Sequence, residues 1–244
     1  IMNMQRYSAE LYRRLGDEVD YPMNYNVTGS VRLGHTKERL QEFQKVVGMG
    51  RYQGMDLNIL SPEDIKKVYP FVETHDLSGA LHDPYDGDID PAQLTQALAK
   101  GARQMGARIE RFCPATGARR EGDEWVISTP KGEIRCEIVV NAAGCYARQI
   151  AQMAGIDIPV TNMEHHYVVT DPIPAFKDRE EEIPVMRCPH VSGYFRQEQK
   201  SGLIGVYENT GLAEAWAPRG GHPEWDSTSE LFPEDLERIA PWLE

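Results

Sequence analysis

The chain has 244 residues, 41% hydrophobic and 26% charged, which is the balance of a globular protein large enough for a substantial core. No apolar run approaches the roughly 20 residues that a membrane-spanning helix needs. The net charge of -12 argues against a general nucleic-acid surface, because backbone phosphates would be repelled.

The first third of the chain predicts helices separated by short strands. Apolar spacing predicts a helix over residues 1–15, and Thr36 can cap a second helix that runs to about residue 47. Ser61 followed by Pro62 is a strong helix start, and that helix must stop before Pro70. We expect strands over residues 26–34 and 77–81.

The segment HDPYDGDID, residues 82–90, is predicted to be a loop. Its four acids suggest a calcium loop, but the glutamate that closes an EF-hand is missing and Pro91 intervenes. We therefore favour Asp90 as the cap of a helix over residues 92–105 and expect no metal. A strand over residues 107–112 should follow.

The stretch GEIRCEIVVNAAGCYAR, residues 132–148, follows a predicted meander with strands at 116–120, 125–128 and 133–136. After the apolar run at 138–140, the chain turns through small residues at 141–144 into a helix at 146–153. Such a turn lets a ligand approach bare backbone, and the helix start offers N–H groups to an anion such as a pyrophosphate. An ordinary strand-to-helix connection fits the turn equally well.

Beyond this turn we expect a long strand over residues 162–170 and a hairpin of residues 192–197 with 202–207. A helix over residues 232–243 should close the chain. The four cysteines form no CxxC pair, which favours free thiols in a reducing compartment over disulfides or zinc. They are Cys113, Cys136, Cys145 and Cys188. This indicates a cytoplasmic protein, or one of the mitochondrial matrix in a eukaryote.

Several segments of the sequence resemble those of the dimethylglycine dehydrogenase and sarcosine dehydrogenase family. They are GSVRLGHT, GALHDPYDGDIDPAQLTQALAKGARQMGA, IVVNAAGCYARQIAQMAGI, EHHYVVT, YFRQE and GLIGVYE. The family comprises FAD-dependent amine oxidoreductases of the D-amino-acid oxidase superfamily. The resemblance implies an α+β fold, with a mixed or antiparallel substrate-binding sheet and part of an FAD-binding α/β domain.

The resemblance also implies that the chain is the central part of such an enzyme. The GxGxxG fingerprint and its nearby flavin-linking histidine are absent, and a folate-binding domain would lie beyond Glu244. The chain starts at Ile1 inside a helical pattern and ends just after another such pattern. We therefore expect both ends to be truncation points within a larger protein. We assign residues 1–87 to the N-terminal helix and substrate domain, 88–156 to the FAD domain, and 157–244 to the substrate sheet.

Amine oxidation needs a base near the substrate nitrogen and donors for its carboxylate. His165 and Tyr194 are the catalytic candidates, because the family's H-x-Y and Y-[YF]-R strands face the flavin at these words. On a strand His165 and Tyr167 share a face and His166 points away, so we interpret His166 as structural. Tyr167 and Arg196 are expected to bind substrate. A hydrogen-bonded core histidine and an acid-paired Arg196 remain the alternatives.

For the cofactor, the resemblance points to Ala115 on the adenine side of FAD and to Ala143, Gly144 and Tyr146 beside the adenosine or pyrophosphate. Tyr146 stands where the family usually has tryptophan, and Ala115 where it has valine. Cys145 has no histidine beside it in sequence and is interpreted as a packed small residue rather than a nucleophile.

Two functions follow. The first is an FAD-dependent oxidoreductase that oxidises the C–N bond of an N-methylated glycine, such as dimethylglycine or sarcosine, by hydride transfer to flavin. The second is a non-catalytic α+β binding module, or an inactive fragment that holds no flavin. The missing GxGxxG fingerprint favours the non-catalytic module or inactive fragment for this chain alone. The many matching segments favour the oxidoreductase for the parent protein.

Overall fold

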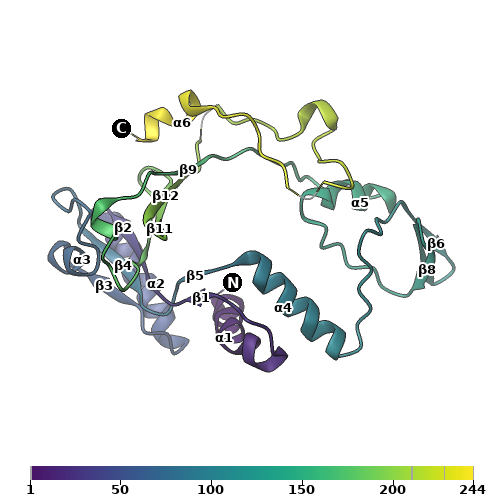
Figure 1. The fold of residues 1–244 in the computed structure, drawn as a ribbon, viewed down its shortest axis with the longest axis horizontal. Helices are drawn as coiled ribbons and strands as arrows, with labels where there is room; N and C mark the ends of the chain where they lie inside the picture. Colours follow the sequence, from purple (N-terminus) through teal and green to yellow (C-terminus); the bar gives the residue numbers. More distant parts are fainter. Residues whose placement is uncertain (1, 210, 228, 244) are drawn as a thin grey trace. The chain divides into compact units, whose positions relative to one another are not determined.

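The computed structural model describes residues 2–209, 211–227 and 229–243. Contacts divide the chain into two units (Figure 1). The first comprises residues 1–108, 165–208 and 239–244, and the second comprises residues 109–164 and 209–238. The assignment of three segments to substrate and FAD domains stays a prediction.

The first unit combines helices with a mixed sheet (Figure 1). Its helices are α1 (Met2–Val19), α2 (Lys37–Tyr52), α3 (Pro62–Val68), α4 (Pro91–Gln104) and the 3-10 turn η2 (Pro174–Phe176). Its strands are β1 (Tyr25–Asn26), β2 (Ser30–Gly34), β3 (Asn58–Leu60), β4 (Gly79–Asp83), β5 (Asp88–Ile89), β9 (Tyr167–Val169), β10 (Val185–Cys188), β11 (Gly193–Glu198) and β12 (Ser201–Val206). Helix α6 (Leu236–Leu243) begins in the second unit and ends in the first.

Among the described residues, seven strands form the main sheet in the order β3-β4-β2-β10-β11-β12-β9. Only the β2–β10 pair is parallel, and the other neighbours are antiparallel. Strands β10, β11 and β12 lie far from β2 in sequence and extend its sheet. This confirms the predicted α+β class with a mixed sheet and the predicted hairpin, now β11–β12.

Helices cover both faces of one end of this sheet. Val31 of β2 is fully buried beside Ile65 of α3, whereas Leu81 of β4 packs with Phe43 of α2. Because alternate strand residues point to opposite faces, the two helices lie on opposite sides. Strand β9, at the other end of the sheet, is more open, with Tyr167 and Val169 about half exposed.

Three helices begin at the predicted caps. The Thr36 hydroxyl accepts from Arg39 N–H at 3.1 Å, the Ser61 hydroxyl accepts from Asp64 N–H, and Asp90 Oδ1 accepts from two N–H groups of α4. Each cap satisfies donors that the first helical turn cannot pair internally. The helix after Ser61 ends before Pro70, as predicted.

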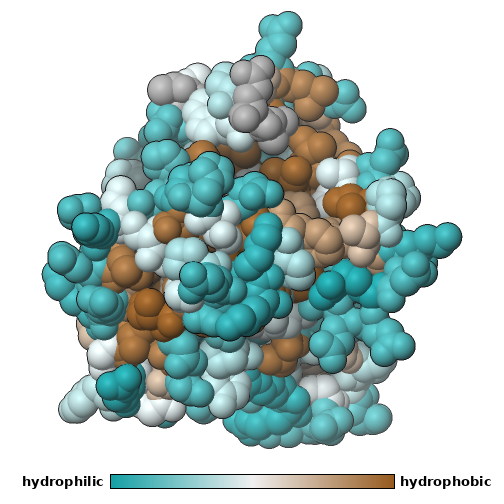
Figure 2. All heavy atoms as spheres, turned by 90° about the vertical axis from the view of Figure 1, so that its left-hand side faces the viewer, coloured by the Kyte–Doolittle hydropathy of each residue, from teal (hydrophilic) through white to brown (hydrophobic). Residues whose placement is uncertain are grey.

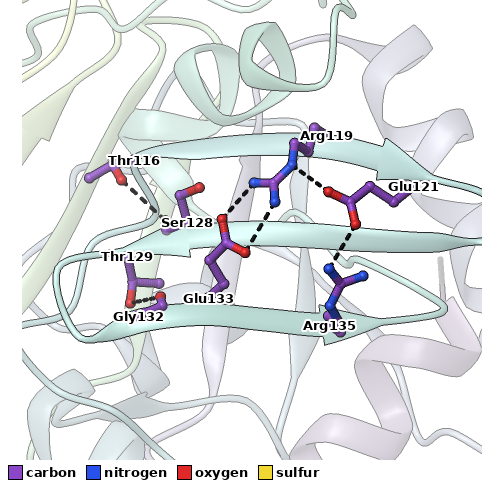
Figure 3. A network of polar contacts seen from close by, with 8 residues as sticks. All are labelled: Thr116, Arg119, Glu121, Ser128, Thr129, Gly132, Glu133 and Arg135. Carbon is purple, nitrogen blue, oxygen red and sulfur yellow. Dashed lines mark hydrogen bonds and ion pairs between the residues drawn. The ribbon is translucent and has the colours of Figure 1, made fainter.

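The second unit contains a three-stranded meander. Its elements are β6 (Gly117–Glu121), β7 (Glu124–Thr129), β8 (Gly132–Cys136), the 3-10 turns η1 (Gly144–Tyr146) and η3 (Ala217–Arg219), and α5 (Ala147–Met153). Figure 3 shows its exposed polar network, in which Arg119 bridges Glu121 and Glu133 and Arg135 binds Glu121. The meander was predicted, and the structure confirms it.

The predicted loop at residues 82–90 is more ordered than expected. Its first two residues continue β4, and Asp88 and Ile89 form β5 by pairing with Asn26 and Tyr25. Gly87 permits this contact, because a Cβ there would overlap the Asn26 carbonyl oxygen. The described residues contain no cluster of three or more histidine, cysteine or acidic residues able to hold a metal.

Two predicted strands are wrong or much shorter. Residues 107–112 form no strand, because no described strand pairs with this segment. Phe112 has φ +53° and is 83% exposed. The strand predicted over 162–170 is reduced to β9, with a single bridge from Met163 to Glu214. Helix α6 likewise begins at Leu236 rather than at residue 232.

The surface of the first unit is mostly hydrophilic where Figure 2 shows it, with separate apolar patches between charged side chains. No helix among the described residues is long and apolar enough to cross a membrane. The four cysteines are free and half-buried, which agrees with the prediction of free thiols.

Candidate active site

One row of residues crosses the open part of the main sheet. In register, Tyr167 of β9 faces Gly205 of β12, Gly205 faces Tyr194 of β11, and Tyr194 faces Arg187 of β10. Arg187 in turn lies beside Arg32 of the parallel strand β2. Paired residues on neighbouring strands project to the same face, so the row places aromatic and cationic side chains on one side of the sheet.

The Tyr194 ring lies directly over Gly205. A Cβ at Gly205 would overlap the Tyr194 ring, so only glycine leaves room for it. The ring also contacts Tyr207 with their centroids 5.5 Å apart. Burial, and then the nearby Tyr207 phenol, raise the pKa of Tyr194. Tyr194 is therefore a protonated phenol at neutral pH, able to donate a hydrogen bond.

A histidine–glutamate pair adjoins these tyrosines. His165 Nδ1 lies 3.1 Å from Glu208 Oε2, and the imidazole meets the Tyr207 ring edge to face at 5.3 Å. The Glu208 side chain has no exposed surface, whereas 38% of the His165 side chain is exposed. A buried carboxylate thus orients an imidazole that is partly exposed.

The predicted alternation of His165 and His166 is wrong. Strand β9 begins only at Tyr167, so neither histidine lies in a ladder, and His166 Nδ1 lies 3.8 Å from Glu208 Oε1. Both imidazoles therefore approach one carboxylate from neighbouring positions. His166 is the more buried of the two, with 16% of its side chain exposed.

The pair has the geometry of an acid–base centre. When His165 Nδ1–H donates to Glu208, the lone pair on Nε2 is free to accept a proton from a bound ligand. The carboxylate sets the orientation of the ring through this contact. His165 and Glu208 both belong to the first unit, so the geometry of this pair does not depend on the second unit.

Arg196 is already engaged. Its Nη2 donates to Glu198, and its Nη1 donates to the Gln197 carbonyl oxygen at 3.2 Å. This matches the alternative of an acid-paired arginine, although its assignment to substrate binding stays a prediction. Tyr167, at 55% exposed, is accessible on the same face as Tyr194.

The cofactor candidates all lie in the second unit. Ala115 is half-buried just before β6, and Ala143 and Gly144 form the turn before α5. Gly144 has φ +55°, and a Cβ built there would meet nothing within 4 Å, so ligand atoms can approach its backbone. Helix α5 has seven residues and is preceded by a 3-10 turn, a weaker anion site than the expected helix.

Tyr146 is held by a small aromatic cluster. Its ring stacks on Trp225 with centroids 4.8 Å apart and an interplanar angle of 15°, and its hydroxyl donates to the Glu224 carbonyl oxygen at 2.6 Å. This rigid flat surface beside the Gly144 turn suits a planar ring system such as adenine. The residues present therefore fit part of an FAD site, while the dinucleotide fingerprint is absent from the sequence.

Sequence reasoning missed Glu208, Tyr207 and the arginine pair. Glu208 lies 43 residues from His165, and no local pattern links them. Tyr207 lies two residues beyond Gly205, so extending the β12 alternation would have placed it beside Tyr194. Strand β10, which carries Arg187, covers residues 185–188, where the sequence analysis predicted no element.

The similarity to known proteins extends over nearly the whole chain. The model of the family "DAO: FAD dependent oxidoreductase" matches residues 1–243. Mouse dimethylglycine dehydrogenase is 37% identical over 97% of this chain but only 28% of its own length. Human sarcosine dehydrogenase is 32% identical over 80% of this chain and 22% of its own length. A 4-methylaminobutanoate oxidase of Paenarthrobacter nicotinovorans is 29% identical over 91% of this chain and 28% of its own length.

Among solved structures, L-proline dehydrogenase from P. horikoshii superposes with a TM-score of 0.78 at 26% identity, covering 98% of this chain and 60% of that one. The chain spans about 28% of the length of the dimethylglycine dehydrogenases it matches. FAD is the cofactor of the matched family. By the match over residues 1–243, this chain belongs to the FAD-dependent oxidoreductases of the DAO family.

Proposed function

We propose that the protein containing this chain is an FAD-dependent oxidoreductase that oxidises the C–N bond of an N-methylated glycine, of the dimethylglycine or sarcosine type. The observation that carries the proposal is the His165–Glu208 pair beside Tyr207 and Tyr194 on the open face of the sheet. A base, its orienting carboxylate and phenolic donors are the groups that amine oxidation requires.

Bound FAD supplies the acceptor for the hydride that leaves the methyl carbon. The substrate amine is protonated in water at neutral pH and cannot release hydride in that form. In our proposal His165 Nε2 takes the ammonium proton, while Glu208 holds the ring and stabilises the imidazolium. Tyr194 and Tyr167 orient the amine so that the methyl carbon points away from the sheet. Loss of hydride then leaves a substrate iminium, which water converts to the smaller amine and a one-carbon product.

We assign cofactor contacts to the second unit. Ala143 and Gly144 offer backbone, Tyr146 offers its stacked ring, and Ala115 offers its backbone on the adenine side. The small side chains of the turn and the fixed Tyr146 ring support this assignment. These residues account for only part of a dinucleotide site.

The choice of substrate rests on the relatives. Dimethylglycine, sarcosine and 4-methylaminobutanoate in their names all combine an N-methylamine with a carboxylate. The two more similar relatives act on the shorter substrates by name, so we propose the glycine series. We also propose folate as acceptor of the one-carbon unit, and a mitochondrial matrix or cytoplasmic location.

A substrate panel tests the proposal. The full-length protein, purified with its flavin, is mixed with dimethylglycine, sarcosine, 4-methylaminobutanoate and glycine, and the smaller amine is measured by mass spectrometry. We expect the highest kcat/KM with an N-methylated glycine and no turnover of glycine. A protein that binds no flavin would favour the non-catalytic module, and a preference for 4-methylaminobutanoate would refute the glycine series.

A further inference from the structure

Two arginines lie side by side on the site face of the sheet. Arg187 of β10 pairs in register with Arg32 of the parallel strand β2 and, on its other side, with Tyr194 of β11. Like charges directly opposite each other destabilise a sheet unless something neutralises them. We therefore expect a folded chain that keeps two adjacent arginines on one face to bind an anion there.

Neither guanidinium is neutralised within the described part of the chain. No hydrogen bond or ion pair joins Arg32 or Arg187 to any described side chain or carbonyl, and both side chains are exposed. By contrast, Arg196 on the next strand binds Glu198. Partial burial of the guanidinium and, next, the positive charge of Arg187 lower the pKa of Arg32, while the negative charge of Asp86 opposes this shift.

We infer that Arg187, with Arg32 beside it, binds the carboxylate of the amino-acid substrate. The inference rests on the proposed function and specifies how that site selects its substrate. A guanidinium presents N–H groups in a fork that matches both oxygens of a carboxylate, and a second guanidinium strengthens that attraction. The engaged Arg196 is then not the main anion ligand.

The placement suits a small amino acid. From β10, which carries Arg187, to β9, which follows His165, there are three interstrand spacings, about 14 Å in all. A long arginine side chain on one side and an imidazole on the other can close most of this distance. Tyr194 and Tyr207 lie between them and contact each other. A carboxylate held at Arg187 would therefore direct the amine across Tyr194 toward His165.

Ligand binding tests this inference without turnover. Trimethylglycine carries the carboxylate, but its nitrogen has no lone pair and cannot form an iminium. Choline carries the same nitrogen with a hydroxyl in place of the carboxylate. Titration calorimetry of the full-length flavoprotein should show trimethylglycine binding more tightly than choline. Arg187→Met should weaken trimethylglycine binding about ten- to a hundredfold, as expected for a lost charge-assisted hydrogen bond, and should not weaken choline binding.

Matched variants separate this role from a structural one. Arg32→Met should weaken trimethylglycine binding less than Arg187→Met, and Arg187→Lys should give an intermediate loss. Arg51→Met removes the same charge from the exposed surface of α2 and should leave binding unchanged. Because the two arginines repel each other, the urea midpoints of Arg187→Met and Arg32→Met should equal or exceed that of the unmodified protein.

Each outcome decides one claim. Trimethylglycine binding unchanged in both Arg187→Met and Arg187→Lys would overturn the inference. Equal affinity of the unmodified protein for trimethylglycine and choline would also overturn it. If carboxylate binding depends on Arg187 but no N-methylated amino acid is turned over, the anion site stands and the proposed function fails. If dimethylglycine is oxidised with the same KM by Arg187→Met, the proposed function stands and the anion site is refuted.

Discussion

Replacing Glu208 with glutamine tests whether the buried carboxylate acts through His165. Glutamine keeps the volume of the side chain and removes its charge, so packing is preserved. The contact to His165 at 3.1 Å is within hydrogen-bond range, and the one to His166 at 3.8 Å is not. A hydrogen bond to a charged group contributes about 1.5–3 kcal/mol, and partial exposure of His165 places the expected loss near the lower end. We predict a fall of roughly tenfold in the rate of flavin reduction.

The assay is a double-mutant cycle with His165→Ala, read by stopped-flow flavin reduction with dimethylglycine. If Glu208 acts through His165, Glu208→Gln has little further effect once His165 is removed. Glu73→Gln, at an 81% exposed side chain of the same unit, is the matched control and should leave the rate unchanged. Equal losses in both backgrounds would refute the reasoning, because Glu208 would then act independently of His165.

Two further predictions concern the sheets. Gly205→Ala would force the Tyr194 ring away and should lower the free energy of unfolding by about 1–3 kcal/mol, measured by urea titration. The control Gly48→Ala, which has open space at its Cβ, should stabilise α2. An unchanged free energy of unfolding in Gly205→Ala would contradict the packing of Tyr194 against Gly205. The Arg119 hydrogen bonds lower the pKa of Glu133, so their stabilisation is present above the unfolded pKa and is lost as pH falls through the lower folded pKa. Melting curves of Arg119→Met should therefore converge with those of the unmodified protein as the pH falls below the lowered pKa of Glu133, and a constant difference in Tm would refute the network's contribution.

Helices and hairpins that depend only on neighbouring residues could be predicted from the sequence. Thr36, Ser61 and Asp90 each precede residues that favour a helix start, and each forms the expected cap. The meander and the β11–β12 hairpin have turn residues between alternating strands, and both are present. In these cases a few neighbouring residues determine the structure, so spacing and turn chemistry suffice.

Features that depend on distant partners were not predictable. Residues 107–112 have strand-like composition, but a strand needs a neighbour to pair with, and the described residues supply none. The β2–β10 pairing joins segments about 150 residues apart and places Arg187 beside Arg32. Sequence alone therefore indicated His165 and Tyr194 but could not reveal Glu208 beneath the imidazole, since burial and a contact across 43 residues leave no local pattern.

The most direct test of the account is anaerobic mixing of the full-length flavoprotein with dimethylglycine while the flavin band at about 450 nm is followed. We predict that the band bleaches in a single turnover, and that His165→Ala retains its flavin but bleaches at least a hundredfold more slowly, within the range of a lost general base. Bleaching by His165→Ala at the unmodified rate, or no bleaching with any N-methylated glycine, would contradict the account.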